Sequence, residues 1–488
     1  MIALALALLL TGALPAGAVA GPAQTRVAFH VHSTWSTGER SLDEVLADAR
    51  HRGIHAVVLT ENLLVRFEYG LFPLRGVLRK VVEKPSVERS GVDRYLAAVE
   101  TAQRRFPDVT VVPGVEVIPY YYWTGSPLTH DLTMWDAQRN LLVVGLARPE
   151  DYAALPAIGH GGSPLSPAAL WRFALGAGVL GGGVALLVLR RERTVRLRHF
   201  RVRVRRRYRL GGSLVVLAGL LLLADAFGAS RLDPYGGSRG SRPYQALIDA
   251  AEARGGLTFW SFPEARDLSH QTLAGWGTVT LRTDPHPDLL VATRGYTGFG
   301  AAYADTVTVT EPGRQWDRVL LDYAEGRRAR PAWGVGEVGY HGPPKALDEA
   351  LTVLWTADRS RAAVLAALRA GQFYALTSTL DYHLVLDDFS IRQEGTETGT
   401  PMGGELRVDG QEPLLLAVRL SADDGREVPV TARLVRSGRV VAELGGTTPL
   451  ERVLRLEPPA PGGREFFRLD VTRPHRLLGN PIFVRRAA

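Results

Sequence analysis

The sequence predicts a mixed α/β fold with parallel strands, interrupted by a two-helix membrane hairpin and followed by a C-terminal β-sandwich. Three observations support this prediction. Apolar strand-like runs alternate with amphipathic helical patterns over most of the chain. Two long apolar stretches flank an arginine-rich segment near the middle. From about residue 384, short alternating runs separated by Gly, Pro and Asp are typical of antiparallel strands.

The first element is an apolar run over residues 1–20. It ends in Ala18-Val19-Ala20, a small-x-small pattern that suits signal peptidase, but no Lys or Arg precedes its apolar core. We therefore expect residues 1–20 to be a signal peptide or an N-terminal anchor.

Strand and helix patterns then alternate. In the first unit, Ser41 and Glu44 form a capping box, and Gly53 can end the helix before a strand at 54–59. Further helix–strand pairs are expected at 92–106 with 109–112, from Pro243 with 257–262, and at 360–370 with 373–376. The aromatic and basic segment 62–85 fits either an amphipathic segment resting on a membrane or a loop and helix packed on the fold.

The apolar stretches Phe173–Leu189 and Leu210–Ala224 are the candidate membrane helices. Each is short beside the ~20 residues that cross a bilayer, although flanking apolar residues can extend it. Two buried core helices are the alternative, but the segment 190–209 contains 11 Arg and one Glu and would then sit against apolar protein. As a cytoplasmic loop it obeys the positive-inside rule. We expect a transmembrane hairpin at 168–229 in a bacterial inner membrane, with both flanks on the extracytoplasmic (periplasmic) side.

Charge and cysteine content restrict the partners. The net charge is +8, but residues 190–209 alone carry +10, so the rest of the chain is slightly acidic. We expect the arginines to meet anionic lipid headgroups, with nucleic acid binding as the less favoured alternative. Because the chain has no cysteine, disulfides, zinc–thiolate sites and thiol nucleophiles are excluded.

Histidine and glutamate side chains at strand ends predict a metal site. The run RVAFHVHS ends with His30 and His32, and side chains two apart on a strand share a face. Both imidazoles can therefore reach one cation. Glu116 ends the strand-like run PGVEV, and His341 follows the glycine-rich run WGVGEVGY.

These motifs resemble the PHP (polymerase and histidinol phosphatase) family of metal-dependent phosphoesterases. The resemblance covers roughly 26–160 and 231–382, and it implies a distorted (β/α)7 barrel in two parts, 24–165 and 231–382. The β-sandwich expected from the alternating pattern then occupies 384–488. It also implies two or three divalent metals at the C-terminal ends of the strands. Such metals activate a water and neutralise phosphoryl oxygens, so no catalytic group is assigned beyond a metal-bound water.

Several positions depart from the family pattern. The family's TDH is TEN here, with Glu61 and Asn62, and its HP is Phe262-Pro263. Its terminal DxH is Gly339-Tyr340-His341, and Asn140 stands where the family often has a histidine; Glu337 is a possible substitute carboxylate. The remaining expected ligands are His30, His32, Glu61, Glu116 and His341, with Asn62, Asn140 and Glu337 as possible additions and Phe262 and Gly339 as degenerate positions.

These residues can hold a divalent metal such as Mn, Zn or Fe, but fewer ions than a typical PHP site, or none. The leading hypothesis is a membrane-anchored, extracytoplasmic phosphoesterase (a hydrolase) acting on a phosphate ester. The competing hypothesis is a pseudoenzyme that binds a ligand or partner without turnover. A nucleic-acid-binding membrane protein acting through 190–209 is the third.

Overall fold

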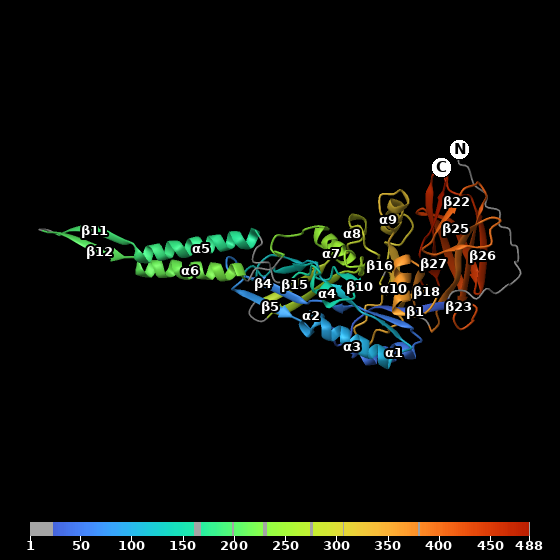
Figure 1. The fold of residues 1–488 in the computed structure, drawn as a ribbon, viewed down its shortest axis with the longest axis horizontal. Coiled ribbons are helices and arrows are strands. Elements are labelled where there is room, and N and C mark those ends of the chain that lie inside the picture. The colour runs from blue at the N-terminus through green and yellow to red at the C-terminus, as the bar shows by residue number, and fades with distance from the viewer. Residues whose placement is uncertain are drawn as a thin grey trace.

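The computed structural model describes residues 23–160, 167–197, 200–227, 232–273, 277–305, 307–378 and 381–487. The molecule is elongated: a mixed α/β body lies in the middle, a strand-rich region at one end, and a pair of helices projects from the other (Figure 1). The expected signal peptide or anchor at 1–20 lies outside the described residues.

The central strands of the body lie in two sheets. The first has the order β22-β29-β27-β28-β19-β18-β1-β2-β6. Its body strands are β1 (Ala23–Val31), β2 (Ala56–Leu59), β6 (Thr110–Val112), β18 (Ala350–Thr356) and β19 (Phe373–Thr377). The second sheet, in order, consists of β17 (Trp333–Gly336), β16 (Gly298–Ala302), β13 (Leu257–Trp260), β10 (Leu141–Val144), β7 (Gly114–Val117) and β3 (Glu61–Asn62).

The mixed α/β class is confirmed, but a closed barrel is not. Strand pairs β1–β2, β2–β6, β3–β7, β13–β16 and β16–β17 are parallel, as the alternating pattern predicts. β10 runs antiparallel to both β7 and β13, which interrupts the series of parallel strands. Among the described residues, these two sheets are separate, so their hydrogen-bond ladders do not close into one ring.

The predicted helices are present and cover the sheets. They are α1 (Leu42–His51), α3 (Val92–Arg105), α7 (Arg242–Glu252) and α10 (Arg361–Ala370). The body also contains α9 (Gln315–Ala324) and the shorter helices α2 (Val87–Ser90), α4 (Pro149–Ala153) and α8 (Asp288–Ala292). Both hydrogen bonds of the predicted capping box form at the start of α1. Apolar faces of these helices and the strands build one continuous core.

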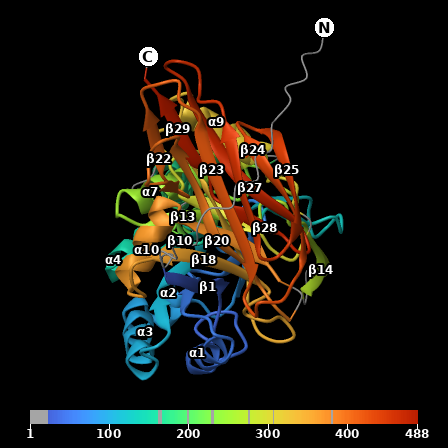
Figure 2. The same ribbon diagram turned by 90° about the vertical axis from the view of Figure 1, so that its right-hand side faces the viewer.

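The C-terminal region consists of strands only. They are β20 (Leu384–Gln393), β21 (Thr400–Pro401), β22 (Glu405–Val408), β23 (Leu414–Ala422), β24 (Pro429–Arg436), β25 (Arg439–Thr447), β26 (Leu450–Leu456), β27 (Arg464–Arg473), β28 (Leu477–Gly479) and β29 (Ile482–Arg486). A hairpin turn at Ser437-Gly438 joins β24 to β25. Because β28 pairs with β19, one sheet runs from the body into this region (Figure 2).

Three antiparallel strand pairs lie at the end of the body nearest the projecting helices. They are β4 (Arg66–Gly70) with β5 (Arg79–Glu83), β8 (Tyr122–Thr124) with β9 (Thr133–Trp135), and β14 (Asp267–Leu273) with β15 (Gly277–Thr283). The expectation of a loop and helix within 62–85 is wrong for this segment, because its alternating side chains form a hairpin in which Phe67 pairs with Val82. β14, β15, β9 and β8 form one sheet in that order.

The projecting pair consists of α5 (Pro167–Val188) and α6 (Arg209–Phe227), and both helices are long and apolar enough to cross a membrane. They pack on each other closely because Gly183 and Gly219 have no side chain at the contact. Their outer surfaces are exposed, so the alternative of buried core helices is wrong. The arginine-rich segment is an antiparallel hairpin of β11 (Arg190–Leu197) and β12 (Phe200–Arg207) rather than a loop (Figure 1).

Candidate metal site

His30 and His32 point their Nε2 atoms at each other across 3.0 Å. The convergence was predicted, but its cause differs from simple strand alternation. His30 adopts a left-handed backbone conformation (φ 72°) where the pairing of β1 with β2 shifts register, and His32 follows the end of β1. Such a bulge re-aims a side chain and is typical of functional sites.

Glu116 completes a group of three metal-ligating side chains, whose ligand atoms all lie within 4.8 Å of one another. Its Oε1 lies 3.5 Å from Nε2 of His30, and its Oε2 lies 3.6 Å from Nε2 of His32. Two nitrogens bound to one cation at about 2.1 Å lie roughly 3.0–3.4 Å apart. The three side chains, all buried, therefore fit a single cation between them.

Partners on the far side of each ring fix which nitrogen faces the site. Nδ1 of His30 lies 2.6 Å from a carboxylate oxygen of Glu337, which can only accept, so this nitrogen carries the proton. Nδ1 of His32 lies 3.3 Å from the hydroxyl oxygen of Ser36, whose own proton is donated to Glu61. Both neutral rings consequently turn an Nε2 lone pair into the site, and the two lone pairs require a shared cation or proton.

The electrostatics of the two rings differ. Burial alone lowers the pKa of His30, but the hydrogen bond to Glu337 and the charges of Glu116 and Glu337 outweigh it and raise that pKa. Burial, together with His30 and His341, holds the pKa of His32 well below its usual value. Without a metal, His30 therefore holds a proton between the two Nε2 atoms more readily than His32 does.

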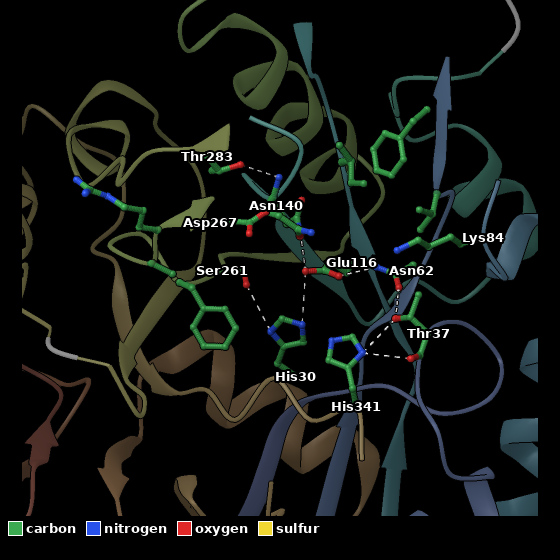
Figure 3. A pocket seen from close by; sticks show the side chains of 17 residues that line it. His30, Thr37, Asn62, Lys84, Glu116, Asn140, Ser261, Asp267, Thr283 and His341 are labelled. Carbon is green, nitrogen blue, oxygen red and sulfur yellow. Dashed lines mark hydrogen bonds and ion pairs between the residues drawn. The ribbon is translucent and has the colours of Figure 1, made fainter. Parts of the chain in front are cut away.

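Asn62 and Asn140 hold the Glu116 carboxylate. Asn62 Nδ2 donates to Oε2 at 2.5 Å, and Asn140 Nδ2 donates to Oε1 at 2.7 Å. Asn62 is directly opposite Glu116 in the β3–β7 ladder, and Asn140 precedes the antiparallel strand β10. Both were possible ligands; in the structure their amide groups orient a ligand (Figure 3).

Glu61, an expected ligand, lies outside the group of three. It alternates with Asn62 along β3, so its side chain points to the opposite face. There it accepts hydrogen bonds from the Ser33 hydroxyl and amide and from the Ser36 hydroxyl. Burial raises the pKa of Glu61 to about 7, against the lowering effect of these bonds. The predicted metal role is not supported by this geometry.

His341 is beside the site and not among the three converging groups. Its ring stacks on His32 with centroids 4.2 Å apart, and its Nδ1 lies 3.1 Å from the Thr37 hydroxyl (Figure 3). Burial lowers its pKa, so the ring favours the neutral form. His341 forms part of the wall rather than the ligand set.

Glu337, the possible substitute carboxylate, orients His30 instead of joining the three ligands. Besides His30, it accepts from the Ser261 hydroxyl at 2.6 Å and from the Phe262 amide at 3.0 Å. It is fully buried, and all three partners fix its position. A carboxylate behind a histidine raises the basicity of that ligand.

The two degenerate positions, Phe262 and Gly339, lie against each other. The Phe262 ring stacks on the face of His30 with centroids 5.3 Å apart, which leaves the Nε2 edge open. A Cβ added at Gly339 would lie 2.6 Å from Cζ of Phe262, so no side chain fits there beside the ring. The space that a family carboxylate at 339 needs is therefore occupied by an aromatic ring.

The site opens into a cavity of about 380 Å³. Its walls include Val65, Phe67 and Ile118, and two cationic side chains, Lys84 and Arg266, line it (Figure 3). Sequence reasoning missed these cations, together with Ser36, Thr37 and Ser261, which orient the rings and carboxylates. None belongs to a recognisable motif; only the spacing of Ser36 from His32 could have indicated a role.

Comparisons with known proteins give weak similarities. No family model matches the sequence, and no curated protein matches it. Similar solved structures include a two-domain protein containing a predicted PHP-like metal-dependent phosphoesterase from Bacteroides vulgatus, 11% identical, covering 96% of each chain with a TM-score of 0.38. A protein from Bifidobacterium adolescentis, assigned as a metal-dependent phosphoesterase, is 14% identical and covers 67% of this chain and 92% of that one, with a TM-score of 0.28.

A third similar structure is an amidohydrolase from Chromobacterium violaceum with bound sulfate and no metal. It is 13% identical and covers 65% of this chain and 88% of that chain, with a TM-score of 0.27. The descriptions of the first two agree with the resemblance found in the sequence motifs. With TM-scores below 0.5, these similarities bear on neither activity nor substrate.

Proposed function

We propose that this protein is a membrane-anchored hydrolase that binds one divalent cation and cleaves phosphate esters outside the cytoplasm. The observation that carries the proposal is the convergence of His30, His32 and Glu116, with both imidazole lone pairs directed at one point. Two histidines and a carboxylate are a common ligand set for a catalytic metal that keeps an open coordination position.

The donor set fits Mn, Zn or Fe. Each ligand also has a hydrogen-bond partner that orients it. Glu337 contacts His30, Ser36 contacts His32, and two side-chain amides donate to Glu116. Such hydrogen bonds to the ligands are usual in metal sites of proteins. A divalent cation held there supplies Lewis acidity toward a water and a phosphoryl oxygen.

The side chains around the cation position supply the remaining requirements. Lys84 and Arg266 line the cavity and can neutralise the charge of a phosphate group. Burial lowers the pKa of His341 and favours its neutral imidazole, the form that a general base requires. Because Phe262 and Gly339 leave no room for a further carboxylate, we propose one cation and not the two or three of the family pattern.

The membrane anchor is proposed from the exposed apolar surfaces of α5 and α6. The arginine-rich hairpin at their far end is placed on the cytoplasmic side by the positive-inside rule, where its arginines meet anionic lipid headgroups. The body then lies on the extracytoplasmic side of a bacterial inner membrane. No nucleic acid partner is proposed.

The test is metal content and turnover of the full chain purified in detergent. We expect wild-type protein to bind close to one equivalent of Mn²⁺ in calorimetry and to hydrolyse bis-p-nitrophenyl phosphate. His30→Ala should lose both properties, and Glu337→Gln should weaken Mn²⁺ binding by about 10–100-fold because it no longer orients the ring. The matched control is His270→Ala, which removes an exposed histidine on β14.

Ligand binding without turnover is the second candidate. It is favoured by the Phe262 ring and by the amides at 62 and 140, which stand where the family pattern has further ligands. Mn²⁺ or Zn²⁺ binding without hydrolysis would favour this candidate. No metal binding by the wild-type chain would contradict the leading proposal altogether.

A further inference from the structure

The turn between β4 and β5 carries large apolar side chains on its surface. Phe72 is 82% exposed and Leu78 is 52% exposed, and Leu71 and Val77 are each 37% exposed. A contiguous group of exposed apolar residues on a soluble body marks a contact surface. The hairpin segment 66–84 also has five Lys or Arg against two Glu, a net charge of +3.

The structure places this turn level with the end of a membrane helix. The amide of Gly76, within the turn, donates to the carboxylate of Asp225. Asp225 lies in the last turn of α6, next to the end of the candidate span Arg209–Ala226. Arg172 of α5 lies 4.0 Å from the same carboxylate, and its neighbour Trp171 is 62% exposed.

Tryptophan and arginine side chains at the ends of membrane helices are typical of the boundary between a bilayer and water. The turn is also fixed there, because the Arg75 guanidinium lies 3.9 Å above the Tyr235 ring and Tyr235 accepts from the Gly70 amide. Its exposed apolar side chains are therefore held beside the point where α6 leaves the proposed membrane.

From this juxtaposition we propose that residues 71–78 dock into the extracytoplasmic leaflet of the bilayer that α5 and α6 cross. The apolar side chains enter the acyl boundary, and the net charge of +3 on the hairpin favours an anionic lipid surface. Val65, Phe67 and Lys84, at the base of the same hairpin, line the cavity. Docking therefore holds the cavity at a fixed height above the membrane. This inference rests on the proposed membrane span, but not on metal binding or turnover.

The test uses the absence of cysteine from the chain. Phe72→Cys and Leu78→Cys, each labelled with the fluorophore NBD, are reconstituted as full-length chains in nanodiscs that hold one chain per disc. Val440→Cys, also at an exposed apolar position but on β25, is the matched aqueous control, and Leu217→Cys on α6 is the membrane control. The readouts are emission wavelength, quenching by nitroxide-labelled lipid, and quenching by aqueous iodide.

We expect NBD at 72 and 78 to emit at shorter wavelength than at 440, to lose most of its emission to nitroxide lipid, and to resist iodide. Lipid quenching at 217 alone, with 72 and 78 behaving like 440, would overturn docking while leaving the span intact. Absence of lipid quenching at 217 would overturn the span and the docking together. A blue shift at 72 seen only with two chains per disc would assign the surface to a second copy of the chain.

Discussion

Neighbouring residues at the site have opposite roles because they point to opposite faces of a strand. Asn62 reaches Glu116, whereas Glu61 turns to Ser33 and Ser36. The Glu61 side chain is fully buried, and it accepts hydrogen bonds from the hydroxyl and amide donors of these two serines. Burial favours the protonated form of this carboxyl, and the hydrogen-bond donors oppose that effect.

Glu61 should therefore make stability depend on pH. Burial raises its folded-state pKa to about 7 from an ordinary value of 4.5. Between these values the folded chain keeps a proton that the unfolded chain releases, so the free energy of unfolding falls as pH rises, by up to about 1.4 kcal/mol per pH unit for one group. Glu61→Gln should remove this component.

The measurement is the difference in thermal midpoint between Glu61→Gln and wild type in detergent with EDTA, from pH 5 to pH 8. We expect the thermal midpoint of the variant to rise relative to that of wild type as pH rises. This difference should level off above the folded-state pKa of Glu61. A difference that is constant over this range would show that Glu61 is ionised throughout. Taking the difference cancels the histidines and the other carboxylates.

Phe262 and Gly339 act as one unit although they belong to different segments. Gly339 has φ +57°, and an added Cβ would contact the end of the Phe262 ring. We predict that Gly339→Ala destabilises the chain through both backbone strain and this clash. In a Phe262→Ala background the clash is absent, so Gly339→Ala should lower the free energy of unfolding by less. The expected coupling is about 0.5–3 kcal/mol.

The control for this cycle is Gly53→Ala. Gly53 has a similar φ of +66° after α1, with nothing within 4 Å of an added Cβ, so it reports the backbone cost alone. Chemical denaturation of the four proteins of the cycle gives the coupling. If Gly339→Ala costs no more than Gly53→Ala, or if the two changes at the site add, the ring does not occupy the space beside residue 339.

Elements with strong local signals were predictable from the sequence. The capping box of α1 and the end of that helix before Gly53 form as expected, because neighbouring residues determine them. The β4–β5 and β11–β12 hairpins were not predicted. Their alternating residues are aromatic or basic rather than apolar, so hydrophobic periodicity did not reveal them.

At the site, motif matching found His30, His32 and Glu116, which do converge. It also assigned ligand roles to Glu61 and His341 by position alone. The structure places Glu61 on the other face of β3 and stacks His341 on His32, so neither is in the group of three. His30 and Glu337 are 307 residues apart in the sequence, so their contact depends on the tertiary fold.

At the scale of the whole molecule, the body and the C-terminal strands form one structural unit. β28 pairs with both β19 of the body and β27 of the C-terminal region. Asn480 donates to the Phe373 carbonyl and accepts from the Gly334 amide, which ties the last turn of the chain to two body strands. We therefore expect the two regions to unfold together rather than as separate domains.

A buried ion pair between these regions tests that expectation. Arg468 of β27 donates to Asp317 of α9 through Nε at 2.6 Å and Nη2 at 2.9 Å, and both side chains are fully buried. Arg468→Ala leaves a buried carboxylate without its partner, which should lower the free energy of unfolding by about 3–5 kcal/mol. Replacing both residues with apolar ones, Arg468→Met with Asp317→Leu, should recover much of that loss, because no unpaired charge remains.

Arg436→Ala is the control, since Arg436 pairs with Glu465 at 2.5 Å on a partly exposed face where such pairs contribute about 1 kcal/mol or less. Denaturant unfolding of the full chain in detergent, followed by tryptophan emission and by far-UV circular dichroism, gives both the size of the effect and its cooperativity. If the regions are one unit, Arg468→Ala shifts the two signals by the same amount, because the nine tryptophans all precede residue 384 while the circular dichroism also reports the C-terminal strands. Two separated transitions, with only the circular dichroism signal shifted, would instead mean that the continuous sheet does not couple the two regions.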